Sequence, residues 1–133
     1  MIKMAAYEDT LKDIETTIGI VPGFMKGLPE DVLVQDWPLF KKYSLGESLI
    51  PAKYREMIGL AVAANIKCPY CQLYHKTAAK LHGATDEELR EIVMSASFTA
   101  RWSAMIHAQN YDYQTFANEL ERIAEHLTNA AKK

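Results

Sequence analysis

Proline and glycine residues divide this chain into segments of helical length. Proline suits the first turn of a helix and glycine suits the left-handed residue after its end, and the chain has this order from Pro29 to Gly46 and from Pro69 to Gly83. No run of alternating Val, Ile or Thr indicates a strand. We therefore predict an all-α protein of about six helices, built from packed helical hairpins. The expected helices cover about 4–18, 29–45, 51–65, 69–83 and 112–129, with another that begins after Thr85.

The helix after Thr85 has a clear start and an unusual distribution of apolar residues. Thr85 and Glu88 have the spacing of a capping box, in which each side chain binds the backbone N–H of the other residue. A helix that is apolar on two faces lies in the centre of a core or also meets another subunit. One face carries Leu89, Ile92, Val93, Ala96 and Ala100, and a second carries Met94, Phe98, Trp102 and Met105.

Length and charge limit the classes of function. The 133 residues are enough for one domain, covering 1–133, that folds without disulfides. The net charge of −2 and the absence of a basic stripe argue against nucleic acid as a partner. The first ten residues lack the apolar core of a signal peptide, and the apolar run 58–66 is too short to span a bilayer. We expect a cytoplasmic protein with no membrane partner.

Both cysteines of the chain lie in the segment Cys68-Pro69-Tyr70-Cys71, and His75 follows one helical turn later. In a reducing compartment this spacing indicates a catalytic or metal-binding pair rather than a structural disulfide. With Cys68 as N-cap of the helix, the free N–H groups and the helix dipole favour thiolate. Residues three and four apart share a helix face, so Cys71 and His75 can touch.

Glu56 adds a carboxylate to this group. It lies in the preceding predicted helix, and a short connector near Ile66 and Lys67 would fold the next helix back beside it. A buried carboxylate in that position would orient the His75 imidazole. The predicted site is thus a chain from Glu56 to His75 to Cys71: orienting group, base and nucleophile. The alternative for Glu56 is a surface carboxylate paired with its neighbours Lys53 or Arg55.

The spacing of Glu56, Cys68, Cys71 and His75 resembles the active-site signature of the carboxymuconolactone decarboxylase family, in its alkylhydroperoxidase D-like branch. The resemblance is close over roughly residues 49–104 and looser elsewhere. It implies an all-α, AhpD-like helical fold that assembles as a homo-oligomer, as a dimer, trimer or hexamer. It also implies a thiol-dependent peroxidase or disulfide reductase that belongs to the oxidoreductases and protects against oxidants.

The resemblance further implies a role for each site residue. Cys71 would attack the peroxide, Cys68 would resolve the sulfenic acid to a disulfide, and Glu56 with His75 would relay protons. The best-studied branch has a histidine between the cysteines where this chain has Tyr70, so the relay differs there. Helix electrostatics alone favour Cys68 as the nucleophile, whereas the neighbouring histidine favours Cys71.

Other uses of the thiols remain open. A protein disulfide reductase or dithiol electron carrier could use the same pair without favouring peroxide. A non-redox assembly module could hold zinc, but Cys68, Cys71 and His75 supply three ligands where a structural site usually has four. No nucleotide, flavin or haem motif occurs, so we expect no cofactor. The expected partners are a peroxide or disulfide substrate and an external dithiol reductant.

Overall fold

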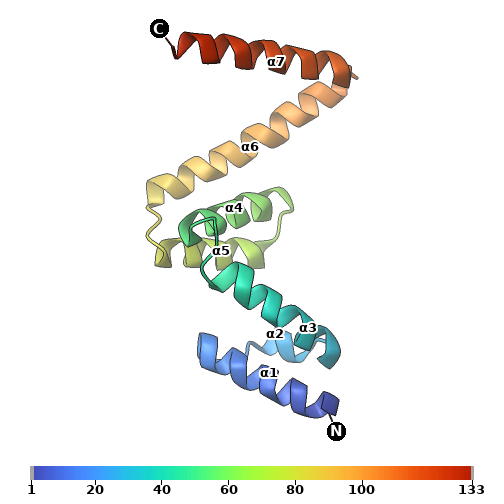
Figure 1. Cartoon of the computed structure of the whole chain (residues 1–133), viewed down its shortest axis with the longest axis vertical. Helices are drawn as coiled ribbons and strands as arrows, with labels where there is room; N and C mark the ends of the chain where they lie inside the picture. Colours follow the sequence, from blue (N-terminus) through green and yellow to red (C-terminus); the bar gives the residue numbers. More distant parts are fainter. Residues whose placement is uncertain (1, 133) are drawn as a thin grey trace.

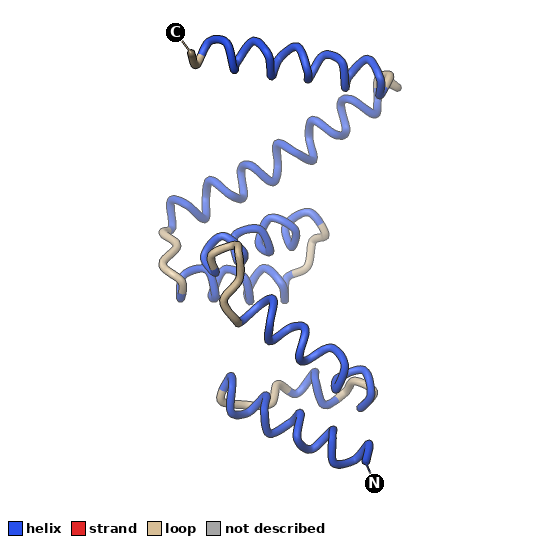
Figure 2. The backbone as a smooth tube through the Cα atoms, viewed as in Figure 1, coloured by secondary structure: helices blue, strands red, loops and turns tan. Residues whose placement is uncertain are grey.

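The computed structural model describes residues 2–132, and within that range the chain forms helices joined by short loops, without a strand (Figures 1 and 2). The prediction of an all-α fold is therefore confirmed. Seven α-helices and one π-helix follow one another within these residues. They are α1 (Ile2–Ile18), α2 (Gly23–Lys26), α3 (Glu30–Phe40), η1 (Lys41–Leu45), α4 (Ala52–Asn65), α5 (Pro69–Leu81), α6 (Asp86–Ala108) and α7 (Tyr113–Ala130).

Two short elements differ from the prediction. The helix α2 lies where we expected only a connector after Val21. The segment predicted as one helix over 29–45 changes at Lys41 from α3 to the π-helix η1. The N–H of Gly46 closes η1 by donating to the carbonyl of Lys41 at 2.8 Å. Arg55 of α4 then donates to the Gly46 carbonyl at 2.7 Å, which ties this end to the next helix.

The buried side chains form two separate clusters. The first joins α1, α2 and α3 and includes Ile14 and Trp37. Trp37 also donates from Nε1 to Asp13 at 2.7 Å, which connects α3 to α1. The second joins α4, α5 and α6 and includes Leu60 and Ala79. That residues 1–133 form one domain stays a prediction.

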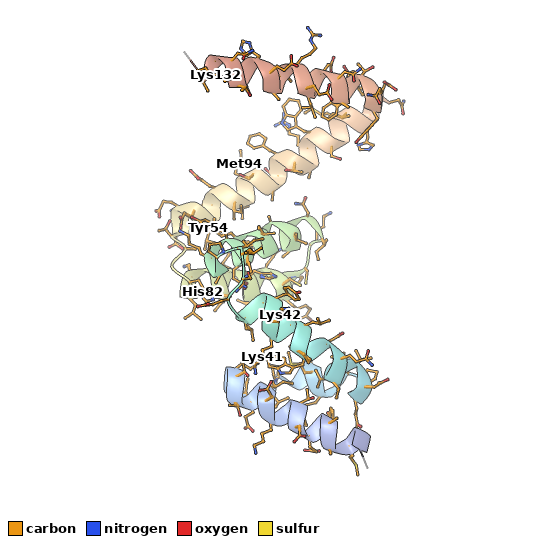
Figure 3. All side chains as sticks on the ribbon, viewed as in Figure 1. Lys41, Lys42, Tyr54, His82, Met94 and Lys132 are labelled. Carbon is orange, nitrogen blue, oxygen red and sulfur yellow. The ribbon has the colours of Figure 1, made fainter. Side chains whose placement is uncertain are left out.

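The second half of α6 and all of α7 extend away from these clusters (Figure 1). Helix α7 has no buried residue. Side chains of both helices project into open space in Figure 3, where Met94 marks α6. None of the helices within 2–132 is long and apolar enough to cross a membrane. The large hydrophobic side chains that α6 and α7 leave exposed are Val93, Met94, Phe98, Trp102, Tyr113, Leu120, Ile123 and Leu127.

Candidate active site

A tight turn between α4 and α5 positions the two cysteines. Ile66 ends α4, and Lys67 adopts a left-handed conformation with φ of 58° that reverses the chain. The N–H of Cys68 then donates to the carbonyl of Ala63 at 3.0 Å. Cys68 is the N-cap of α5, as predicted, and Pro69 follows in the first turn. Because α5 packs against α4, residues on the facing sides of both helices meet beside the thiols.

The two thiols form one hydrogen-bonded unit. Their sulfur atoms lie 2.6 Å apart without a covalent bond. The backbone N–H of Cys71 also donates to Sγ of Cys68 at 3.2 Å. This second hydrogen bond makes Sγ of Cys68 the better hydrogen-bond acceptor of the two sulfurs. Hydrogen bonds from the Cys71 thiol and from backbone N–H groups lower the pKa of Cys68. The same thiol hydrogen bond, together with burial, raises the pKa of Cys71.

Glu56 and His75 form the second unit of the site. Nδ1 of His75 lies 2.8 Å from Oε2 of Glu56. Glu56 is only 3% exposed and is therefore a buried carboxylate whose charge requires a partner. The structure thus brings together the pair that the sequence spacing predicted. The alternative of a surface pair is wrong, because Lys53 binds Glu88 at 2.7 Å and Arg55 binds the loop after η1.

Two aromatic rings lie beside the imidazole. The ring of Tyr74 meets the His75 ring edge-on, with centroids 5.0 Å apart, and Phe40 of α3 lies 6.5 Å from Tyr74. Burial raises the pKa of the Tyr74 hydroxyl. Tyr70, in contrast, is 85% exposed and does not enclose the thiols. Sequence reasoning missed Phe40, because no local pattern indicates that the end of α3 approaches α5.

The dithiol lies at the start of α5 and His75 one turn further along the same helix, while Glu56 reaches His75 from α4; the dithiol and the Glu56–His75 pair are not directly bonded. Among the hydrogen bonds of residues 2–132, none joins the imidazole to either sulfur. Over the same part of the chain, no three His, Cys, Asp or Glu side chains gather as a candidate metal site. The arrangement therefore offers two free, hydrogen-bonded thiols and, one turn away, an oriented imidazole that can carry a proton.

The fold and the site together define an all-helical protein with a dithiol at a helix N-terminus and a carboxylate–imidazole pair beside it. Residues 33–111 match the carboxymuconolactone decarboxylase family. This range covers more than half of the chain and includes all four predicted site residues. The chain therefore belongs to the carboxymuconolactone decarboxylase family.

A solved structure supports the same assignment. The chain is similar to the crystal structure of the alkylhydroperoxidase AhpD core from Rhodospirillum rubrum, with 27% sequence identity and a TM-score of 0.73. The match covers 85% of this chain and 87% of that chain. The search of curated proteins found no match. The AhpD-like fold predicted from the sequence is thus confirmed.

Proposed function

We propose that this protein is a thiol-dependent peroxidase that reduces a hydroperoxide with the Cys68–Cys71 pair. The observation that carries the proposal is the 2.6 Å separation of two free thiols beside an oriented imidazole. The similarity to an alkylhydroperoxidase core supports it further. The chemistry needs no bound cofactor, because the thiols themselves supply both electrons.

In the first step Cys71 attacks the peroxide. Its raised pKa means that it needs a base, and His75 lies one turn further along α5. The imidazole takes the Cys71 proton while Sγ attacks the terminal peroxide oxygen, and the O–O bond breaks. The proton then passes to the leaving alkoxide. The products are a sulfenic acid on Cys71 and an alcohol, while Glu56 holds the charged imidazole in place.

In the second step Cys68 resolves the sulfenic acid. Its lowered pKa makes it a thiolate more readily than an isolated cysteine. This thiolate attacks Sγ of Cys71, hydroxide leaves and becomes water, and a disulfide forms. An external dithiol must then reduce the disulfide by thiol–disulfide exchange, becoming a disulfide itself. A cytoplasmic location, where thiols are kept reduced, suits this cycle.

Trapping the sulfenic acid tests the division of roles. We expect Cys68→Ser treated with peroxide to be labelled by a sulfenate probe at Cys71, and Cys71→Ser not to be labelled at Cys68. The wild-type protein treated with peroxide should form one intramolecular disulfide per peroxide consumed, measured by mass spectrometry. Labelling in Cys71→Ser alone would reverse the roles, and no reaction of the wild-type thiols with peroxide would reject the peroxidase.

A second candidate is a protein disulfide reductase or dithiol carrier. The hydrogen bonds that lower the pKa of Cys68 favour it, because an N-cap thiolate can attack a disulfide directly. Turnover of a hydroperoxide and of a model disulfide with the same dithiol donor separates the two functions. A higher kcat/KM on the disulfide would favour the carrier.

We also infer that the chain works as a homo-oligomer whose subunits meet through α6 and α7. The isolated chain exposes 10521 Å². A compact monomer of 15.0 kDa exposes about 7,000 Å², so the excess is about 3,500 Å². A standard interface buries about 800 Å² on each partner, so the excess is enough for an extensive contact with further copies of the chain. The apolar side chains that α6 and α7 expose would fill this contact.

The oligomeric state in solution tests this surface. We expect light scattering to give a mass at least twice 15.0 kDa. Leu120→Glu, on the exposed apolar face of α7, should lower that mass, whereas Asn118→Glu on the opposite face should leave it unchanged. A wild-type protein that is monomeric at micromolar concentration would contradict the inference.

A further inference from the structure

Gly59 lies in the interior of α4, one turn after Glu56. Glycine is less favourable than alanine inside a helix because it loses more backbone freedom on folding. A left-handed conformation would justify glycine, but the glycines with positive φ in residues 2–132 are Gly19 and Gly83. The backbone of α4 therefore does not require glycine at this position, and the reason must lie in the surrounding side chains.

The space beside Gly59 is occupied by the imidazole of His75. A Cβ atom at position 59 would lie 2.6 Å from Nε2 of His75 and still closer to Nδ1 and Cε1. Carbon atoms in contact lie about 3.5–4.0 Å apart, so the ring occupies the volume that any side chain at 59 would fill. The three nearest atoms all belong to this one ring. Gly59 thus accommodates His75 specifically and not the backbone of α5.

We propose that Gly59 is a positioning residue for the candidate site: its missing side chain lets the His75 imidazole lie flat on α4 and reach Glu56. The same ring that covers Gly59 holds Nδ1 at 2.8 Å from Oε2 of Glu56. Tyr74 meets this ring edge-on and limits where it can move. A methyl group at 59 would push the imidazole away from Glu56 and change the position of its second nitrogen relative to the thiols. The catalytic meaning of this placement rests on the proposed function, but the placement itself does not.

Gly59→Ala in the full-length protein is the test, with Gly23→Ala as the matched control. A Cβ at Gly23 meets nothing within 4 Å. We expect Gly59→Ala to shift the NMR signals of the His75 ring and to lower the thermal midpoint, although alanine is the better helix former. The rate of peroxide reduction should fall by up to about 10²-fold, as for a small misplacement of a catalytic group. Gly23→Ala should leave the His75 ring signals and the rate unchanged.

Combining Gly59→Ala with His75→Ala tests whether the imidazole is the cause of the lower thermal midpoint. Without the imidazole, Gly59→Ala should raise the thermal midpoint, because helix preference alone then acts. If Gly59→Ala does not fold, recovery of folding in the double variant supports the same conclusion. An unchanged His75 signal in Gly59→Ala, or a lower midpoint in both backgrounds, would overturn the proposal. A wild-type protein inactive on peroxide would reject the function but not this placement, because the NMR signals and thermal midpoints do not depend on turnover.

Discussion

Replacing His75 with alanine leaves the Glu56 carboxylate without its partner inside the protein. Glu56 is 3% exposed, and its hydrogen bond to His75 is 2.8 Å long. Lys53 and Arg55 bind elsewhere, so these neighbouring cations do not replace the imidazole. The variant must therefore bury the carboxylate without its hydrogen-bond partner or admit water to it. Each of these lowers the free energy of unfolding.

The size of this effect follows from the burial of the two partners. Leaving a buried hydrogen-bonding group without its partner costs about 1–3 kcal/mol, and more when that group is charged. The His75 side chain is 26% exposed, so solvent screens part of the interaction. We therefore expect His75→Ala to lower the free energy of unfolding by about 2–3 kcal/mol, because the unpartnered group is a carboxylate. Adding Glu56→Gln should recover about 1–2 kcal/mol of this loss, because the amide is neutral and leaves no buried charge without a partner.

Urea denaturation of the wild type, the two single variants and the double variant measures this coupling. Lys76→Ala, an exposed change next to His75, is the control and should alter stability by less than about 0.5 kcal/mol. A coupling below about 0.5 kcal/mol between positions 56 and 75 would refute the reasoning, because the two side chains would then act independently. A changed m-value would instead indicate an altered denatured or native state.

Three further predictions concern the thiols and the start of α6. Cys71→Ala removes the main hydrogen bond that lowers the pKa of Cys68, so alkylation of Cys68 should move to higher pH; an unmoved pH–rate profile would contradict this. Thr85→Ala removes the N-cap of α6 and should lower the free energy of unfolding by about 1 kcal/mol in urea, and unchanged stability would contradict the role of the cap. A hydrogen bond from Lys53 lowers the pKa of Glu88. The stability that this bond contributes is therefore present above the unfolded pKa of about 4.3 and lost as pH falls through the folded pKa. Glu88→Gln should therefore lose less stability than the wild type between pH 5 and 3. Equal losses in the two proteins would contradict this contribution of the Lys53–Glu88 hydrogen bond.

The helix starts were predictable because their signals are local. Pro51, Pro69 and Thr85 each mark the first turn or cap of a helix within one or two residues of where it begins. The helix α2 was not predicted, because four residues are too few to show a helical period. The change from α3 to η1 at Lys41 was also missed, because π-helices are rare and short and the sequence pattern predicted one continuous helix.

The candidate site was likewise predictable only where the signal was local. Glu56 and His75 were predicted to meet because a short connector leaves α5 little choice but to fold back along α4. Phe40 and Gly59 were not found, because their roles depend on how closely the helices approach each other. Spacing along the chain predicts which residues can meet, whereas the volume left between packed helices is visible only in three dimensions.

Three of the four predicted site residues lie on the consecutive helices α4 and α5, and the fourth, Cys68, is the N-cap of α5. Contacts between segments close in sequence form fast, since little loop entropy is lost in bringing them together. We therefore expect the dithiol to become oxidisable as soon as this helical hairpin forms, before α6 and α7 make the subunit contact that we propose. If the protein assembles as we propose, its thiols become reactive before its subunits associate, and the redox state of the surroundings acts on the monomer first.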